Sequence, residues 1–504
     1  MPRLLLLFIL FTTSLSAQFT DRYWAFGDSA GIDFKNLSSP QPANSILRVR
    51  GSCASICDSA GDLLFYCGSP NWQQWRAVNN IFTDGYVINK NHQVMHSGDS
   101  LATTLWYQEM VIVPMPGNDS LFYIFCAGVV NPVVGLFYSI VDLKYNNGQG
   151  RVIQKNVQIR TDSICDGITA IRHGNGRDWW VIVRTWKDIP TKDITPYLVS
   201  PSGVTAYPTQ SIGPNVTLQG FYRLKFNNSG THLYNVNNTG SIERYDFDRC
   251  TGVFSNRIIY STQSGPFNGF WGFEVSPDES KLYASLIYQT SVGDTGYVLQ
   301  FDLNSPNFLA SADTLELFTA PDTPGLLELG PDGKIYLSIT WAGGDTCYDY
   351  LFCSGTVNTT NSNLSVINYP DSVGAACDFQ PFSFYLGGHK TYWGLPNNHN
   401  YELGAWVGSP CDTLSVGIQD LFPKNKELKL YYDKTWQTVF VNAEELQGRK
   451  AILEFYNING QLIERISSET DGSYFSKSSS FSSQADGVYI VRLSTRRKCS
   501  QGSL

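Results

Sequence analysis

Short apolar and aromatic runs, each preceded by a polar turn, recur along most of the chain. The turns are rich in Gly, Asn, Asp and Ser, as in Gly117-Asn118-Asp119-Ser120 and Gly330-Pro331-Asp332-Gly333. Apolar runs bounded by such residues are typical of strands. An aromatic anchor marks each repeat, and successive anchors lie 49 to 57 residues apart, at Tyr66, Tyr123, Trp180, Tyr234, Tyr283 and Tyr336.

A second run follows several anchors and carries an Asp between two apolar residues. Its instances are Val141-Asp142-Leu143, Tyr245-Asp246-Phe247 and Phe301-Asp302-Leu303. Anchor and follower therefore predict consecutive antiparallel strands. A unit of about 50 residues is too small to bury its own apolar face and has to pack against copies of itself. The pattern predicts an all-β fold with a β-propeller over residues 18–411.

The number of anchors predicts seven blades. A further step of 57 residues beyond Tyr336 reaches Trp393, in Lys390-Thr391-Tyr392-Trp393-Gly394. The early segment Tyr23-Trp24-Ala25-Phe26-Gly27 is similar to this last one, so we expect the two ends of the ring to meet in one blade. Six or eight blades are also compatible with the spacing.

The repeat stops after Cys411, and the pattern changes. Residues 412–425 have the composition of a linker. From residue 426 to residue 504, about seven short alternating runs follow one another, including Thr438-Val439-Phe440-Val441 and Val488-Tyr489-Ile490-Val491. They predict a small immunoglobulin-like β-sandwich.

The first 17 residues have the pattern of a secretory signal peptide. Arg3 is followed by an apolar run from Leu4 to Phe11 and then by small polar residues up to Ala17. The run is too short to span a bilayer, and no later run is long enough. We therefore expect no transmembrane segment and a protein that is secreted or attached to the cell surface.

Composition and charge exclude several classes of protein. Charged residues make up only 16% of the chain and aromatic residues 14%, which argues against coiled coils and disorder. The net charge is −8, and no concentrated basic face is visible in the sequence. Nucleic acid is therefore not expected as a partner.

The chain has eleven cysteines, an odd number, in a sequence predicted to be exported. Cys347 and Cys353 flank a short insertion and could close it with a disulfide bond. The other pairings stay open. No C-x-x-C motif or Cys/His cluster has the spacing of a metal site, so neither a metal nor another cofactor is predicted.

No catalytic constellation is complete. Gly27-Asp28-Ser29-Ala30-Gly31 matches the G-x-S-x-G pattern but lacks the helix that follows a nucleophile elbow. A GDSL-type esterase would also need a late Asp-x-x-His, which is absent. We therefore predict no catalytic residues. Three tryptophans in loop-like segments are the candidate ligand-binding residues: Trp72, Trp75 and Trp341.

Two parts of the chain resemble families of exported bacterial proteins. Residues 20–410, with Cys53 to Tyr66 as the first blade, resemble exported WD-repeat-like propeller proteins of Bacteroidetes-type bacteria. Leu453-Glu454-Phe455-Tyr456-Asn457-Ile458-Asn459-Gly460 and Ala485-Asp486-Gly487-Val488-Tyr489 resemble the C-terminal sorting domain of the type IX secretion system. The resemblance implies export through the outer membrane, with the type IX translocon as partner.

These observations support a secreted or cell-surface binding or scaffold protein, with a glycan or a protein as ligand. The alternative is an extracellular polysaccharide hydrolase or lyase, because a propeller can place acid and base residues around its central channel where sequence spacing reveals nothing. A third possibility is a structural protein of the cell surface that associates with itself.

Overall fold

The computed structural model describes residues 20–70, 85–104, 106–130, 133–186, 191–216, 222–261, 269–290, 293–341, 360–412, 429–433, 437–444, 450–457, 461–469, 474–481 and 489–496. The chain divides into two compact units, Met1–Leu414 and Ser415–Leu504. Each unit is described by itself. No helix in the described residues is long and apolar enough to cross a bilayer.

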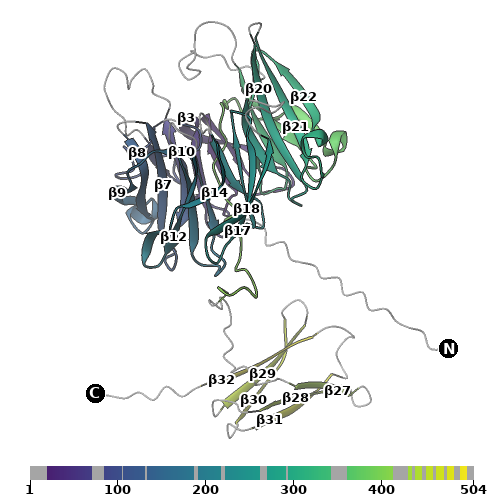
Figure 1. Ribbon diagram of the computed structural model, residues 1–504. Helices are drawn as coiled ribbons and strands as arrows, with labels where there is room; N and C mark the ends of the chain where they lie inside the picture. The colour runs from purple at the N-terminus through teal and green to yellow at the C-terminus, as the bar shows by residue number, and fades with distance from the viewer. Residues whose placement is uncertain are drawn as a thin grey trace, which may run out of the picture. The chain divides into compact units, whose positions relative to one another are not determined.

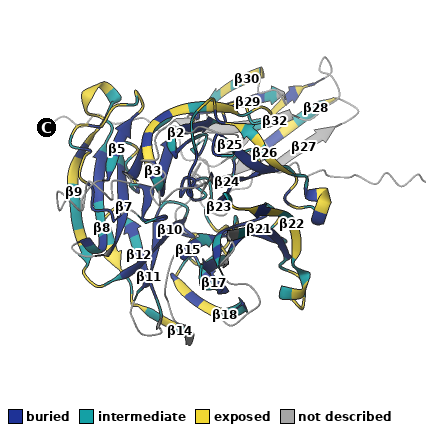
Figure 2. Ribbon diagram, turned by 90° about the horizontal axis from the view of Figure 1, so that it is seen from above, coloured by how far each residue is buried: buried dark blue, intermediate teal, exposed yellow. Residues whose placement is uncertain are grey.

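The described part of the first unit forms six antiparallel sheets, the blades of a β-propeller. Figure 2 shows β3, β10, β15 and β23 near the middle and β9, β18 and β22 at the rim. The first three blades contain β1 (Tyr23–Phe26), β2 (Asp28–Asp33), β3 (Gln41–Cys57), β4 (Leu63–Pro70) and β5 (Tyr86–Asn89); β6 (Met110–Pro114), β7 (Leu121–Val130), β8 (Val133–Asp142) and β9 (Arg151–Arg160); and β10 (Ile164–Arg172), β11 (Trp179–Thr185), β12 (Thr191–Ser200), β13 (Gly203–Ala206) and β14 (Gln210–Val216).

The other three blades continue around the ring, with neighbouring strands paired in sequence order. Three short 3-10 turns, η1 (Asn146–Gly148), η2 (Leu309–Ser311) and η3 (Gly374–Cys377), lie between strands. The strands are β15 (Tyr222–Phe226), β16 (His232–Asn237), β17 (Ile242–Asp248) and β18 (Val253–Ser261); β19 (Phe270–Val275), β20 (Lys281–Thr290), β21 (Gly293–Asp302) and β22 (Asp313–Thr319); and β23 (Asp322–Leu329), β24 (Ile335–Trp341), β25 (Asn363–Ile367) and β26 (Phe379–Tyr385).

The all-β propeller is confirmed, but the prediction of seven blades is wrong. Five anchors lie on the second strand of a blade, on β7, β11, β16, β20 and β24, and the sixth lies on β4, the strand that follows β3 in the first blade. The seventh, Trp393, belongs to no strand. Gly394 and Pro396 interrupt the apolar run after it, and the backbone around Trp393 pairs with inner strands of other blades instead of forming a new hairpin.

The ring closes through its N-terminal strands. β3 is 17 residues long; its first half pairs with β2 and its second half with β4, so the first sheet spans a bend. Trp24 packs edge-on against Tyr336 of β24, with ring centroids 5.6 Å apart. Asp28 N also donates to Lys390 O at 2.8 Å. The two ends of the propeller region therefore meet, although Lys390 contributes only isolated bridges.

Aromatic anchors fill the spaces between blades, where they are almost fully buried. Phe65 of β4 meets Phe122 of β7 at 5.4 Å, and Trp180 of β11 meets Phe247 of β17 at 6.3 Å. Edge-to-face pairs of this kind add to the free energy of burying large apolar surfaces. The high aromatic content therefore has a structural use.

The second unit contains six described strands in two three-stranded sheets, where the sequence predicted about seven strands (Figure 1). One sheet consists of β27 (Lys429–Asp433), β28 (Thr438–Glu444) and β31 (Tyr474–Ser480), and the other of β29 (Lys450–Asn457), β30 (Leu462–Glu469) and β32 (Tyr489–Arg496). Their shared apolar core contains Val441, Ala451, Leu453, Phe455 and Phe481.

Because each unit has its own core, we expect the propeller to be stable without the second unit. A chain that ends at Leu414 should unfold within about 2 °C of the propeller transition of the full chain, as measured by differential scanning calorimetry. A transition lowered by more than about 5 °C would show that the propeller depends on residues 415–504.

Candidate functional site

The centre of the propeller is filled by the chain's own segment from residue 391 to residue 401. Trp393 O accepts a hydrogen bond from Leu326 N at 2.8 Å, and Gly394 N donates to Arg50 O at 3.2 Å. The Asn397 side chain donates to Met110 O at 3.1 Å and to Ile168 O at 2.8 Å. We call residues 391–401 the channel segment. It contacts inner strands of four blades, β3, β6, β10 and β23.

We call the end of the propeller where the inner strands begin the start face, and the end where the inner strands finish the exit face. The channel segment runs from the start face toward the exit face. Tyr401 Oη donates to Ile112 O at 3.1 Å, and Arg172 donates to Tyr401 O at 2.7 Å. Beyond it, Cys411 forms a disulfide bond with Cys250, which follows β17. The chain is therefore fixed by hydrogen bonds at Tyr401, within the propeller, and by the disulfide bond at Cys411, further along the chain.

Aromatic side chains gather where the channel segment meets the start face. Trp271 and Trp393 stack with ring centroids 4.6 Å apart, and Tyr107 meets Trp271 edge-on at 5.5 Å. The Arg50 guanidinium lies 4.7 Å from the centre of the Tyr107 ring. Trp271 is half-buried, whereas Tyr107 and Trp393 are buried.

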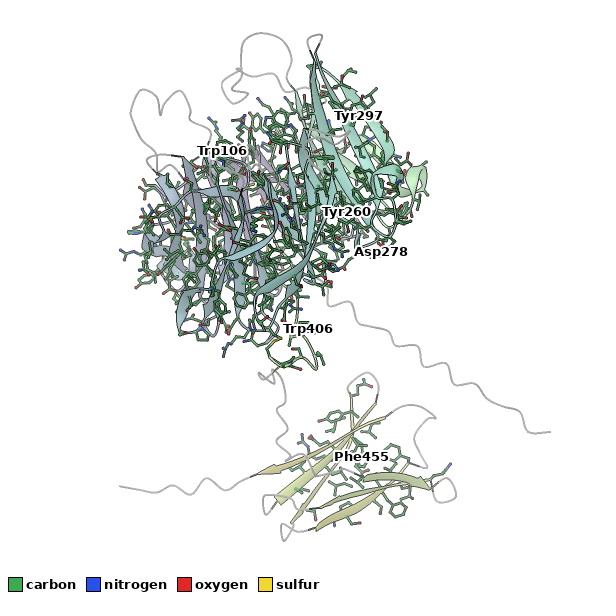
Figure 3. The ribbon with its side chains drawn as sticks, in the orientation of Figure 1. Trp106, Tyr260, Asp278, Tyr297, Trp406 and Phe455 are labelled. Atoms are coloured by element: carbon green, nitrogen blue, oxygen red, sulfur yellow. A yellow bond between two sulfur atoms is a disulfide. The ribbon has the colours of Figure 1, made fainter. Side chains whose placement is uncertain are left out.

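Two other half-buried tryptophans lie at the same face. Trp106 precedes β6, and Trp186 directly follows β11, where it packs on Cys165 and Tyr222. Figure 3 places Trp106 and the exposed Trp406 at opposite ends of the propeller. The neighbouring residues Trp179 and Trp180 are almost fully buried and belong to the core.

The structure describes only some of the ligand-binding and disulfide residues predicted from the sequence. Trp72 and Trp75 lie outside the described residues, as do Cys347 and Cys353. Trp341 is the last residue of β24, paired with Asp322, and not part of a loop. Sequence spacing did not identify the Cys250–Cys411 bond, because its two cysteines are 161 residues apart. Six described cysteines are free and buried: Cys53, Cys57, Cys67, Cys126, Cys165 and Cys377.

A polar pocket lies beside the channel segment, toward the exit face. Its volume is about 50 Å³. The inner strands β10, β15, β19 and β23 and the channel segment supply most of its lining. The polar residues that matter for its chemistry are Asp21, Lys225, Glu274, Glu328, Asn398 and His399.

Buried ion pairs join three blades at this pocket. Lys225 of β15 bonds to Glu274 of β19, and its Nζ lies 2.5 Å from Glu328 Oε1 on β23. Arg223 Nη2 lies 2.5 Å from Glu328 Oε2. Burial raises the pKa of Glu328 to about 6, against the effect of the two cations.

Asp21 and His399 complete the polar lining of the pocket. Asp21 Oδ1 accepts hydrogen bonds from Trp24 Nε1 at 3.0 Å and from the Asn398 amide, and burial raises the pKa of Asp21. His399 is 8% exposed and meets the Trp179 ring edge-on at 5.0 Å. Burial lowers the pKa of His399 to about 3, so its imidazole is neutral at pH 7.

This arrangement is suited to holding strands together and to binding a small polar group. Lys225 pairs with both Glu274 and Glu328, so these carboxylates are held by a cation. The described residues contain no group of three His, Cys, Asp or Glu side chains that could hold a metal ion. The channel segment occupies the axis of the propeller.

Another buried carboxylate joins blades near the start face. Asp166 of β10 accepts from Tyr222 N at 2.9 Å through Oδ1 and from Tyr107 N at 3.4 Å through Oδ2. Tyr107 precedes β6 and Tyr222 begins β15, so one side chain links three consecutive blades. Burial raises the pKa of Asp166 to about 7.

Comparison with known proteins assigns no family to this chain. No protein-family model matches the chain, and no curated protein matches it. Among solved structures, it is similar to the Dos1 propeller (9% identity, TM-score 0.37, 82% of this chain and 85% of the other). It is also similar to the Cps50 (Swd1) β-propeller domain of Myceliophteria thermophila (9% identity, TM-score 0.32, 64% and 93%).

A third similar structure is an auxiliary nutrient binding protein from Bacteroides thetaiotaomicron (15% identity, TM-score 0.29, 50% of this chain and 61% of the other). At these identities and scores, the comparisons transfer no ligand and no activity. The class that the sheets define is an all-β protein, a six-bladed β-propeller followed by a small β unit.

The first prediction from this geometry concerns the close approach of Gly394 to Gly51. A Cβ atom at Gly394 would lie 2.2 Å from Gly51 Cα and 2.3 Å from Gly51 O. Because backbone atoms cannot move aside easily, Gly394→Ala should lower the free energy of unfolding by about 2 kcal/mol or more, measured by guanidinium denaturation. At Gly404 no atom lies within 4 Å of the added Cβ, so Gly404→Ala should change it by less than about 0.5 kcal/mol. Equal stability of the two variants would contradict a tightly filled channel.

The second prediction concerns pH. The folded pKa of Asp166 is about 7, above the ordinary value, so the folded state keeps a proton that the unfolded chain releases near pH 4. The contribution of Asp166 to stability is therefore fully present below about pH 4 and is lost as the pH rises through about 7. The denaturation midpoint should fall between about pH 5 and about pH 8, and it should fall less in Asp166→Asn. The same pH dependence in both proteins would rule out this assignment.

Proposed function

We propose that this chain is a secreted or cell-surface binding protein, with its ligand-binding surface on the start face of the propeller. The observation that carries the proposal is the channel segment, which fills the axis with residues of the chain itself. A ligand larger than a few atoms therefore has to bind on a face of the ring. The alternative, a polysaccharide hydrolase or lyase with its site on the propeller channel, is less favoured, because residues of the chain itself fill that axis.

The half-buried tryptophans favour a glycan as the ligand class. Trp106, Trp186 and Trp271 come from three different blades, and each is partly exposed near the start of the inner strands. Rigid aromatic side chains provide large contact areas at a low cost in conformational entropy, and they also carry a polar N–H group. A sugar ring presents apolar C–H faces and polar edges that match this combination.

Export is the second part of the proposal. The N-terminal residues 1–17 would direct the chain to the periplasm as a signal peptide. The second unit would serve as an immunoglobulin-like sorting domain recognised by the type IX translocon. Support comes from the sequence resemblance and from the separation of Ser415–Leu504 as a compact unit with its own apolar core.

The binding proposal is tested by tryptophan variants. We expect the full chain to bind one or more glycans on an array of bacterial and host polysaccharides. Trp186→Ala and Trp271→Ala should each weaken that binding about tenfold or more, because aromatic anchors carry a large share of binding energy. Affinities are measured by isothermal titration calorimetry.

Trp406→Ala is the matched control, because Trp406 is 42% exposed and lies at the other end of the propeller. The affinity of Trp406→Ala for the glycan should equal that of the unmodified chain. Unchanged binding by a Trp186→Ala/Trp271→Ala double variant would rule out the start face as the binding surface. Turnover of a polysaccharide would favour an enzyme instead.

A further inference from the structure

The pocket beside the channel segment contains polar groups that the protein does not pair. In the described part of the chain, neither His399 ring nitrogen has a hydrogen-bond partner, although the residue is only 8% exposed. Trp24 and Asn398 both donate to Oδ1 of Asp21, which leaves Oδ2 as an acceptor. Unpaired polar groups in such an environment are costly, so they call for a water molecule or a ligand.

The charges around the pocket balance. The two glutamates, Glu274 and Glu328, face two cations, Lys225 and Arg223, which lie beside them. Burial raises the pKa of Asp21 and so favours its uncharged form. Neither an anion nor a cation would find an excess of opposite charge. A neutral ligand is favoured, one that can both donate and accept hydrogen bonds.

The pocket's size limits the ligand further. A volume of about 50 Å³ corresponds to roughly four water-sized positions, at about 10–15 Å³ each. The hydrogen-bonding groups of the lining differ, since the Asp21 carboxyl oxygen Oδ2 can accept a hydrogen bond while Lys225 can only donate one. A neutral imidazole donates a hydrogen bond from one ring nitrogen and accepts one at the other. Two adjacent hydroxyl groups each supply a donor and an acceptor within this size.

We propose that this pocket binds a vicinal diol, from a free small polyol or from the end of a sugar. One hydroxyl donates to Asp21 Oδ2, and the other accepts from Lys225 while bonding to the His399 imidazole. The site lies toward the exit face and is separate from the tryptophans of the start face. The two binding proposals can therefore fail independently.

The experiment is saturation-transfer NMR on the full chain with ethylene glycol as the probe. The expected result is saturation transfer to ethylene glycol and none to 1,2-dimethoxyethane, which has the same backbone but no donors. Asp21→Asn and His399→Phe should each lower the affinity about tenfold or more. His399→Phe keeps a ring of similar shape. If Asp21→Asn does not fold, the affinity of His399→Phe for ethylene glycol tests whether the pocket is the binding site.

Asp166→Asn is the matched control, since Asp166, like Asp21, is a buried carboxylate but does not line the pocket. This variant and Trp271→Ala should bind ethylene glycol like the unmodified chain. Saturation transfer to a methyl glycoside that persists in Trp271→Ala but is lost in His399→Phe identifies a sugar end as the source of the diol, whereas pocket-dependent transfer to ethylene glycol alone identifies a free polyol. Equal signals in the pocket variants, or no transfer at all, would show that the pocket holds only water and would overturn the proposal.

Discussion

The filling of the central channel is the constraint on which the rest of the structure depends. A ring of six sheets leaves space along its axis, and protein interiors tolerate few voids larger than a water molecule. Residues 391–401 occupy that space as irregular backbone, so their polar groups need partners inside the ring. The inner strands provide them through Arg50 O, Met110 O, Ile168 O and Leu326 N. The same bonds that satisfy the segment therefore tie four blades to one another.

Buried charges reinforce this arrangement in a way that favours a particular register. Arg184 Nη1 lies 2.8 Å from Glu243 Oε2, both fully buried, and Arg257 Nη2 lies 2.8 Å from Glu243 Oε1. The two guanidinium groups lower the pKa of Glu243 to about 2 despite its burial. A buried ion pair contributes little net stability compared with an apolar pair, but removing one partner is costly. We therefore interpret these networks as fixing which blades are neighbours.

Sequence reasoning identified what depends on local pattern. The polar turn followed by an aromatic run located one strand in each of the six blades, because turn chemistry and alternation act over a few residues. It failed at Trp393, since spacing alone cannot distinguish an anchor that packs between blades from a tryptophan that packs in the channel. The signal that could have separated them is Gly394 and Pro396, which interrupt the run where a strand should continue.

The pocket could not be predicted in the same way. Asp21, Lys225, Glu328 and His399 are spread over nearly the whole propeller sequence and meet only because the ring closes. None of these four residues is part of a sequence motif, and each is of a type that is common in its own strand or turn. The Cys250–Cys411 bond has the same origin, since it depends on where the channel segment leaves the ring. Sites built from inner strands of several blades are therefore visible only once the topology is known.

One residue of the channel segment links the start face to the interior of the ring. Trp393 stacks on Trp271 at the start face, while its carbonyl oxygen bonds to Leu326 N of β23. The half-buried Trp271 thus rests on a ring whose own backbone is fixed within the channel. A platform held in this way loses little conformational freedom when a ligand binds, and preorganisation of this kind increases affinity without any new contact. Filling the channel therefore removes an interior site and, by the same contacts, makes the start face a more rigid surface for recognition.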